Sequence, residues 1–139
     1  MIRKFDPADM DTVLDIWLEA SVLAHDFVEQ DFWHRQLQPM REIYIPASDT
    51  FVYQVAGQVV GFYALYEESL AAIFVAPNYQ GRGIGKVLLS HAKTMREKLS
   101  LCVYKENQKS YRFYLSQGFT VIGEQQDKHT GHPEFLMSN

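Results

Sequence analysis

Three glycines at alternate positions follow an apolar segment and could bind a phosphate group. The run Ile73–Ala76 is strand-like and ends at Pro77, and Gly81, Gly83 and Gly85 then open a long amphipathic segment. A helix N-terminus offers unpaired backbone N–H groups and the positive end of the helix dipole. Glycine removes the side chains that would hold an anion away from these groups. The spacing therefore predicts a phosphate or pyrophosphate site at a strand-to-helix turn.

Two common phosphate-binding motifs do not fit this loop. The dinucleotide fingerprint needs its third glycine three residues after the second, where this chain has Lys86. A Walker A loop needs Ser or Thr after its Gly-Lys pair and a first glycine five residues before the second. Here Val87 follows Gly85-Lys86, and Gln80 stands at the first glycine position.

The cysteine and the histidines suggest neither a disulfide nor a metal site. Cys102 is the only cysteine, and no His or Lys lies beside it, so we expect a buried thiol in a strand and not a nucleophile. Four of the histidines form no zinc-ligand spacing with carboxylates or the thiol: His34, His91, His129 and His132. We therefore expect no metal.

The elements that must position these residues alternate in type along the chain. Helical periodicity is expected in four segments: from the Asp6-Pro7 cap to Leu18, and over Gln30–Met40, Gly83–Leu99 and Asn107–Ser116. Apolar or alternating runs predict six strands: Thr50–Val55, Val59–Tyr66, Leu70–Val75, Leu101–Tyr104, Phe119–Glu124 and Glu134–Met137. This pattern predicts an α/β fold with a mixed, mostly antiparallel sheet flanked by helices.

Length and composition narrow the class of protein. The 139 residues fit one domain, residues 1–139, and 47% are hydrophobic. The net charge of -4 provides no basic field for nucleic acid. No apolar run approaches the roughly 20 residues that span a bilayer, and the N-terminus has no signal-peptide core. We therefore expect a cytoplasmic protein with no membrane or nucleic-acid partner.

Two motifs in the right order resemble the GNAT superfamily of N-acetyltransferases. The segment Gln80–Gly85, preceded by Phe74–Pro77, fits that family's Gln/Arg-x-x-Gly-x-Gly/Ala loop. A second signature is similar to its Asn-x-x-Ala-x-x-Phe-Tyr-x-x-x-Gly-Phe segment and consists of Asn107, Ser110, Phe113, Tyr114, Gly118 and Phe119. The resemblance runs through the whole chain and is closest to short bacterial members, which also match at Ala24–Phe27 and Thr130–Pro133.

The resemblance implies that acetyl-CoA is the ligand. Its pyrophosphate would lie on backbone N–H groups of the loop, and its pantetheine arm would pair with the central strand in a slot made by a splayed strand pair. The residues implied for cofactor binding are Phe74, Val75, Gln80, Gly81, Arg82, Gly83, Ile84, Gly85, Lys86 and Asn107. Of the two cations, Lys86 is the one expected to point at water.

The resemblance also implies acetyl transfer to an amine by direct attack in a ternary complex. Tyr114 occupies the position of the general acid, because a phenol with a pKa near ~10 can protonate a leaving thiolate. A backbone N–H near Val75 would hold the oxyanion. Family members that use a strand glutamate as base have it where this chain has Ser69. Two routes stay open instead: the amine binds already neutral, or it loses its proton through a water chain ending at Glu68, Glu134, His25 or His132.

The acceptor is expected to be a primary amine of a protein lysine, a protein N-terminus or a small molecule. His25 lies in the irregular stretch after the first helix, where the family builds its acceptor pocket. Further candidates for that pocket are Phe27, Trp33, Tyr63, Tyr66, Glu68 and Leu70. The alternatives are a non-catalytic acyl-CoA sensor and a nucleotide-binding interaction module. Either a monomer or a homodimer fits the sequence.

Overall fold

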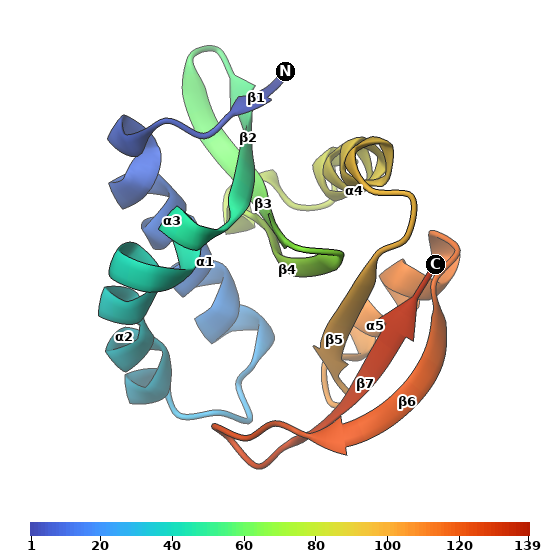
Figure 1. The fold of residues 1–139 in the computed structure, drawn as a ribbon. Helices are drawn as coiled ribbons and strands as arrows, with labels where there is room; N and C mark the ends of the chain where they lie inside the picture. Colours follow the sequence, from blue (N-terminus) through green and yellow to red (C-terminus); the bar gives the residue numbers. More distant parts are fainter.

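The chain folds around a seven-stranded mixed sheet, seen in a computed structural model that describes residues 1–139 (Figure 1). The strand order is β1-β2-β3-β4-β5-β7-β6. The strands are β1 (Ile2–Lys4), β2 (Asp49–Val55), β3 (Gln58–Tyr66), β4 (Ser69–Val75), β5 (Ser100–Tyr104), β6 (Thr120–Gln126) and β7 (Pro133–Ser138). All neighbouring strands are antiparallel except β4 and β5.

Helices cover both faces of this sheet. They are α1 (Met10–Ala24), α2 (Gln30–Pro39), α3 (Ile45–Ala47), α4 (Ile84–Met95) and α5 (Gln108–Ser116), with short turns η1 (Pro7–Asp9), η2 (Met40–Tyr44) and η3 (Pro77–Tyr79). Residues of α1 and α2 share one hydrophobic cluster with β2 and β3. Residues of α4 belong to a second cluster, against which aromatic residues of α5 pack. None of the helices is long and apolar enough to cross a membrane.

The sheet opens between its two central strands. The parallel strands β4 and β5 pair only at Ser69 and Ser100. On its other side, β5 pairs with β7 along its whole length, for example Leu101 with Met137. Beyond Ser69, the edge of β4 that faces β5 therefore has no strand beside it. Figure 1 shows the two halves of the sheet diverging from this point. The prediction of a mixed, mostly antiparallel sheet with a splayed central pair is confirmed.

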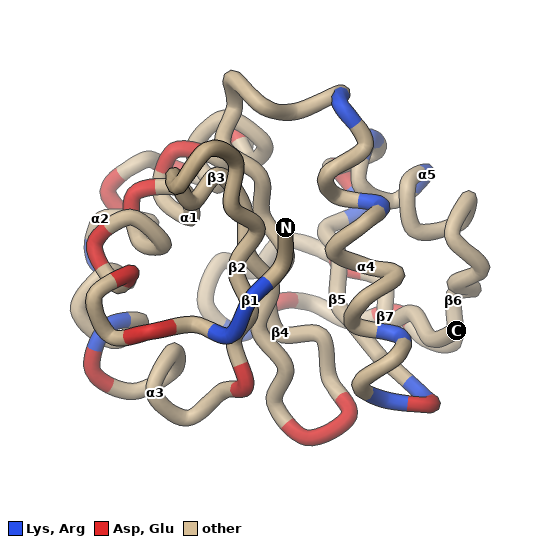
Figure 2. Tube along the Cα trace, turned by 90° about the horizontal axis from the view of Figure 1, so that it is seen from above, with Lys and Arg blue, Asp and Glu red and all other residues tan.

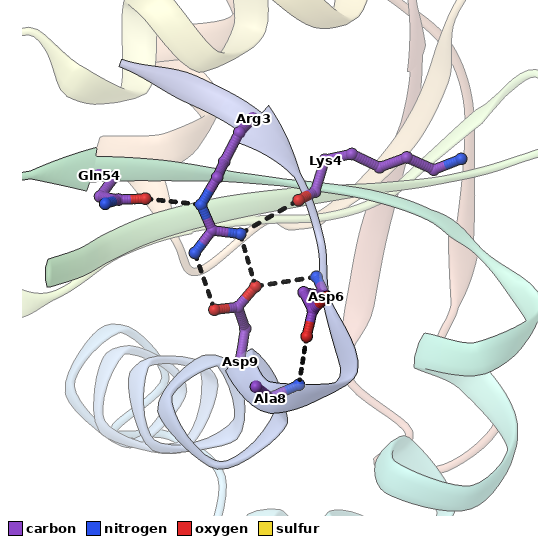
Figure 3. A network of polar contacts seen from close by, with 6 residues as sticks. All are labelled: Arg3, Lys4, Asp6, Ala8, Asp9 and Gln54. Atoms are coloured by element: carbon purple, nitrogen blue, oxygen red, sulfur yellow. Dashed lines mark hydrogen bonds and ion pairs between the residues drawn. The ribbon is translucent and has the colours of Figure 1, made fainter. Parts of the chain in front are cut away.

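A polar network fixes the start of α1 against the first strands (Figure 3). The Asp6 carboxylate accepts the Ala8 N–H at 2.9 Å, and Asp9 accepts the Asp6 N–H at 2.9 Å. These reciprocal bonds are a capping box, which satisfies donors left free at a helix start. Arg3 donates to both Asp9 oxygens, at 2.8 and 2.9 Å, and to Gln54 at 2.6 Å. The Asp6-Pro7 cap therefore begins a short 3-10 turn, and α1 follows from Met10.

The sequence prediction misses one strand and extends one helix too far. The strand β1 is not predicted by the sequence, because three residues are too few for a recognisable pattern. The helix expected to reach Leu99 ends at Met95. Arg96 adopts an extended backbone there, and its guanidinium donates to Glu67 O and to Asp49 Oδ2, each at 2.8 Å. These long-range bonds end α4 one turn early.

Candidate functional site

A cavity of about 1010 Å³ occupies the opening between β4 and β5. Of its 31 lining residues 19 are hydrophobic, and they come from both strands, the glycine loop, the start of α5 and the end of α1. One continuous space therefore joins the phosphate-binding motif to the segment where the acceptor pocket is expected.

The glycine loop supplies free backbone donors at one end of this cavity. Gly81 and Gly83 have φ angles of 78° and 83°, a left-handed conformation that other residues adopt at a cost. The first helical bond of α4 runs from Val87 N–H to Gly83 O at 3.1 Å, which leaves the N–H groups of residues 84–86 without helical partners. A Cβ added at either Gly81 or Gly83 would meet only open space.

Of the residues predicted around the loop, most line the cavity. Gly81, Gly83, Ile84, Gly85 and Lys86 do so directly. Gln80 does as well, and its side-chain amide donates to Val75 O at 3.0 Å, so it also ties the loop to the end of β4.

Arg82 is outside the cavity lining. Its guanidinium lies 5.0 Å from the centre of the Tyr79 ring, in a cation–π contact. Lys86, which was expected to point at water, lines the cavity together with Lys109 of α5. Lys109 was not predicted, because no motif distinguishes it from a solvated lysine on a helix surface.

The middle of the cavity has the unpaired edge of β4 on one side and α5 on the other. Phe74 and Val75 line it from the strand. Asn107 caps α5 by accepting the Ser110 N–H at 3.3 Å, and it also lines the cavity. An extended ligand with amide groups fits here, because backbone groups of the free strand edge need partners.

Tyr114 lines the same cavity two helical turns beyond the Asn107 cap. Its ring packs against Phe113 and Phe119, and burial alone raises the pKa of the phenol above its ordinary value. The nearby phenol of Tyr111 makes a tilted contact with Phe135, with ring centres 4.8 Å apart, and is outside the lining. Tyr114 is therefore a neutral hydroxyl facing the space between loop and strand.

Tyr104, another phenol near the cavity, has its hydroxyl in hydrogen bonds to other residues. Its hydroxyl donates to the Asp127 carboxylate and accepts a weaker bond from the Thr130 hydroxyl at 3.4 Å. Burial and the Asp127 hydrogen bond raise its pKa. The ring packs edge-on against His25 at 5.2 Å, so Tyr104 helps to build the wall at the α1 end of the cavity.

Aromatic side chains form the end of the cavity opposite the loop. His25 and Trp33 both line it there, with their rings stacked 5.0 Å apart. Leu70 of β4 also lines the cavity, but it belongs to the hydrophobic cluster that contains residues of α4. Phe27 does not reach the lining but packs edge-on against His25 at 5.7 Å. His25 Nδ1 and Trp33 Nε1 are buried without hydrogen-bond partners.

Three residues expected near the acceptor lie elsewhere. Glu68 sits in the turn between β3 and β4, beside residues 95–98, because the strand ends before it can face the cavity. Tyr63 is fully buried under α4, where its hydroxyl is 2.5 Å from His91 Nδ1. Tyr66 is 52% exposed at the end of β3 and outside the lining. Strand register and sheet face, which no local sequence pattern reveals, decide where these residues lie.

Two carboxylates line the cavity. Glu134, on β7, accepts a hydrogen bond from Gln125 at 2.9 Å. Glu106 follows directly after β5 and pairs with His132 at 3.0 Å. Glu106 was missed, although a polar residue at the end of a central strand is a recognisable site signal. No three His, Cys, Asp or Glu side chains gather closely enough to hold a metal ion.

Cys102 is exposed, which corrects the expectation of a buried thiol. It lies on β5 between the buried residues Leu101 and Val103, so strand alternation turns its side chain to the other face, where it lines the cavity. Partial burial, together with the charges of Glu134 and Asp127, raises the thiol pKa. The sulfur is therefore a neutral thiol and a poor nucleophile.

Comparisons with known proteins agree with this arrangement. A family model described as "Acetyltransferase (GNAT) domain" matches residues 46–121. The peptidyl-lysine N-acetyltransferase YiaC of Escherichia coli (strain K12) is 32% identical over 139 residues, covering 99% of this chain and 95% of the relative. The peptidyl-lysine N-acetyltransferase YjaB of the same strain is 28% identical, covering 99% and 93%.

Solved structures share the fold. Apo YjaB from Escherichia coli superposes with a TM-score of 0.86 at 26% identity, covering 99% of this chain and 95% of that one. The PaiA N-acetyltransferase of Thermoplasma acidophilum, solved with coenzyme A, has a TM-score of 0.86 at 18% identity, covering 100% and 97%. With the family model and the full-length relatives, these likenesses establish that the chain belongs to the GNAT family of N-acetyltransferases, for which acetyl-CoA is the acetyl donor.

Proposed function

We propose that residues 1–139 act as one acetyltransferase domain that acetylates lysine side chains of proteins. The observation that supports this most strongly is the single cavity, which runs from the glycine loop past Tyr114 to the aromatic end formed by His25 and Trp33. A donor and an acceptor can therefore meet inside it. Full-length relatives at 32% and 28% identity are named peptidyl-lysine N-acetyltransferases, which favours a protein lysine as acceptor.

The donor half of the site would hold acetyl-CoA, which supplies an activated thioester when bound. Free N–H groups of residues 84–86 would bind its diphosphate, with Lys86 as the nearest lining cation of the loop. Phe74 and Val75 would offer the unpaired edge of β4 to the amides of the pantetheine arm. A backbone N–H near Val75 would stabilise the negative charge that develops on the carbonyl oxygen.

Tyr114 would act as general acid. Its phenol stays protonated at neutral pH because burial raises its pKa, so it has a proton to give to the departing thiolate. The thiol of Cys102 is neutral, because burial and the nearby charges of Glu134 and Asp127 raise its pKa, and this favours direct attack by the amine over an acyl-enzyme step.

Of the four groups considered from the sequence, Glu134 is the best placed to receive the proton of the acceptor amine through water. A lysine amine has a pKa near ~10.4 and must lose a proton before it attacks. Of the other three, Glu68 and His132 are outside the lining, and His25 uses its Nε2 in a contact with Asn107. Glu134 lines the cavity and keeps one carboxylate oxygen free of the Gln125 bond.

The test is a comparison of acceptors, with released CoA thiol as the readout. Lysine peptides with a blocked N-terminus, lysine-free peptides with a free N-terminus, and spermidine are each mixed with acetyl-CoA and the protein. We expect turnover with the blocked lysine peptides and, by mass spectrometry, acetyl-lysine in the product. Turnover confined to spermidine or to free N-termini would contradict a lysine acceptor. CoA binding without turnover of any amine would favour the sensor alternative.

A further inference from the structure

A side-chain contact bridges the cavity between the acceptor end and the helix that carries Tyr114. His25 Nε2 lies 3.3 Å from Asn107 Nδ2, although the two residues are 82 positions apart in the chain. His25 follows the last residue of α1, and Asn107 is the cap of α5. Both residues line the cavity. The contact therefore joins two segments that no strand pairing connects.

The direction of this hydrogen bond follows from the second contact of the amide. Asn107 Oδ1 accepts the Ser110 N–H at 3.3 Å, so the nitrogen of the same carboxamide faces His25 and donates. His25 Nε2 must then be the acceptor, with the ring proton on Nδ1. Burial lowers the pKa of His25, which keeps the ring neutral and its acceptor available.

The imidazole is held in place by aromatic neighbours. It stacks on Trp33, with ring centres 5.0 Å apart. Phe27 and Tyr104 pack edge-on against it, with their ring centres 5.7 and 5.2 Å away. Only 8% of the residue is exposed. Any flat ring of similar size would satisfy this packing. Only a ring with an acceptor at the Nε2 position also satisfies Asn107.

The splayed sheet makes such a bridge consequential. Strands β4 and β5 pair only at Ser69 and Ser100, so sheet hydrogen bonds do not fix their separation near the other end of the cavity. Asn107 and Tyr114 are seven residues apart, two helical turns, and therefore face the same side of α5. A contact that holds the cap of α5 also holds the Tyr114 hydroxyl relative to the acceptor end.

We propose that His25 is a positioning residue that acts through Asn107. By accepting the Asn107 amide, it sets the distance between α1 and α5 and thereby places the Tyr114 hydroxyl for proton transfer. His25 does not itself exchange a proton with either substrate. This inference rests on the proposed role of Tyr114 as general acid.

The experiment is a double-mutant cycle on kcat and KM. His25→Phe keeps a ring for packing and removes the acceptor, and Asn107→Ser keeps a good helix cap and removes the donor to His25. We expect each variant to lower kcat about tenfold, as loss of one positioning hydrogen bond does. KM for acetyl-CoA should change little in His25→Phe, whereas Asn107→Ser can also raise it because Asn107 lines the donor half of the cavity. The double variant should be no slower than Asn107→Ser alone, because the two residues act through one contact.

A conservative variant separates positioning from packing. His25→Gln can present an amide oxygen to Asn107 while it loses the aromatic stacking, so we expect it to recover kcat to within about threefold of the unmodified protein. Thermal unfolding of every variant identifies losses that come from the fold. If His25→Phe does not fold, the cycle is run with His25→Gln and Asn107→Ser. His25→Gln alone should then keep its kcat, and the double variant should be no slower than Asn107→Ser alone.

Three results would overturn the inference: an unchanged kcat in His25→Phe, effects that multiply in the double variant, or a His25→Gln variant slower than His25→Phe. Tyr114→Phe is assayed in parallel. If Tyr114→Phe keeps its rate, the proposed acid is wrong and the cause lies in the proposed function. If it slows while the two bridge variants multiply, only the positioning role fails.

Discussion

At the scale of single residues, a phenol is useful as an acid only while it keeps its proton. Tyr114 is placed among Phe113 and Phe119 on α5, and this burial raises its pKa. A raised pKa keeps the proton on the phenol but makes it a weaker acid, so Tyr114 would donate as negative charge develops on the departing sulfur. Lining the cavity, Tyr114 meets the requirement that the acid be within reach of the reacting group.

Tyr114→Phe therefore tests the acid directly. The substitution removes one hydroxyl and keeps the ring that packs against Phe119, so the fold should be retained. We expect kcat to fall about a hundredfold, as for loss of a general acid, with acetyl-CoA affinity unchanged by calorimetry. Tyr111→Phe is the matched control, because that phenol lies outside the cavity lining. An equal loss in both variants would contradict the assignment.

The residues that the sequence could predict are those fixed by a local motif. The glycines and Tyr114 belong to short signatures whose spacing survives folding, and all of them reach the cavity. Glu68, Tyr63 and Arg82 were misplaced because their positions depend on strand ends, sheet face and a contact with Tyr79. The bridge between His25 and Asn107 spans 82 residues, and no local pattern encodes it.

At the scale of elements, the strand-to-helix turn is the part of the site that depends on glycine. Gly83 caps α4 with a φ of 83°, and this backbone turns the free N–H groups of residues 84–86 toward the cavity end. A Cβ there costs about 1–2 kcal/mol through the left-handed conformation. It also adds a side chain immediately before the free N–H groups of residues 84–86, where no atom beyond the adjacent residues lies within 4 Å.

Gly83→Ala and its control Gly57→Ala separate strain from binding. Gly57 has a φ of 80° in the turn between β2 and β3, it also faces open space, and it is outside the cavity lining. Both substitutions should lower the free energy of unfolding by about 1–2 kcal/mol. Only Gly83→Ala should weaken acetyl-CoA binding, by about tenfold, in calorimetry. Equal affinities in the two variants would mean that the loop does not bind the diphosphate.

The capping network of Figure 3 predicts a dependence of stability on pH. Hydrogen bonds from Arg3 hold the pKa of Asp9 below its ordinary value of 3.8. A carboxylate whose pKa is lower in the folded chain than in the unfolded chain stabilises the fold at pH values above its unfolded-state pKa. This stabilisation is lost as the pH falls through its folded-state pKa. The contribution of Asp9 should therefore be complete above pH 5 or so and disappear below 3.8.

Thermal unfolding of Asp9→Asn across pH measures this contribution. We expect the variant to melt a few degrees below the unmodified protein at pH 7, and the difference to shrink as the pH falls below 3.8. Asp49→Asn is a suitable control, because Asp49 also pairs with an arginine, but its side chain is 60% exposed and lies on a strand. A difference that stays constant down to pH 3 would contradict the role of the Asp9 charge.

Element boundaries were predictable where the pattern is long and local. The helices near Gln30, Ile84 and Gln108 and the hairpin β2–β3 follow from periodicity and turn residues. The strand β1 and the segment Met40–Ala47 were missed. They are short, and their neighbours define them more than their own residues do.

At the scale of the whole molecule, charge is distributed unevenly around the cavity. Figure 2 shows Asp and Glu along α1, and Lys and Arg along α4 and α5. The cavity opens between these two sides, since its lining comes from α1, the start of α4 and α5. An anionic cofactor is favoured on the basic side and a cationic acceptor on the acidic side, which agrees with acetyl-CoA and a lysine.

The splay of the sheet is what makes this a transferase site and not a closed core. Its existence was predicted from family resemblance, because composition and periodicity do not reveal how two parallel strands separate. The local sequence of β4 and β5 is apolar and would suit a fully paired sheet. The opening beyond Ser69 and Ser100 is therefore a property of the whole fold, and the cavity depends on it.

The most direct test of the central claim is to follow individual backbone amides while acetyl-CoA is added. In a nitrogen–proton correlation spectrum, the signals of residues 81–86 and Asn107 should shift, while that of Gly57, in the turn between β2 and β3 and outside the cavity lining, should not. ATP should shift the signals of the same loop amides less, because it lacks the pantetheine arm that would lie along β4. Loop amides that stay unmoved by saturating acetyl-CoA, or shifts confined to another surface, would contradict acetyl-CoA binding in the opening between β4 and β5.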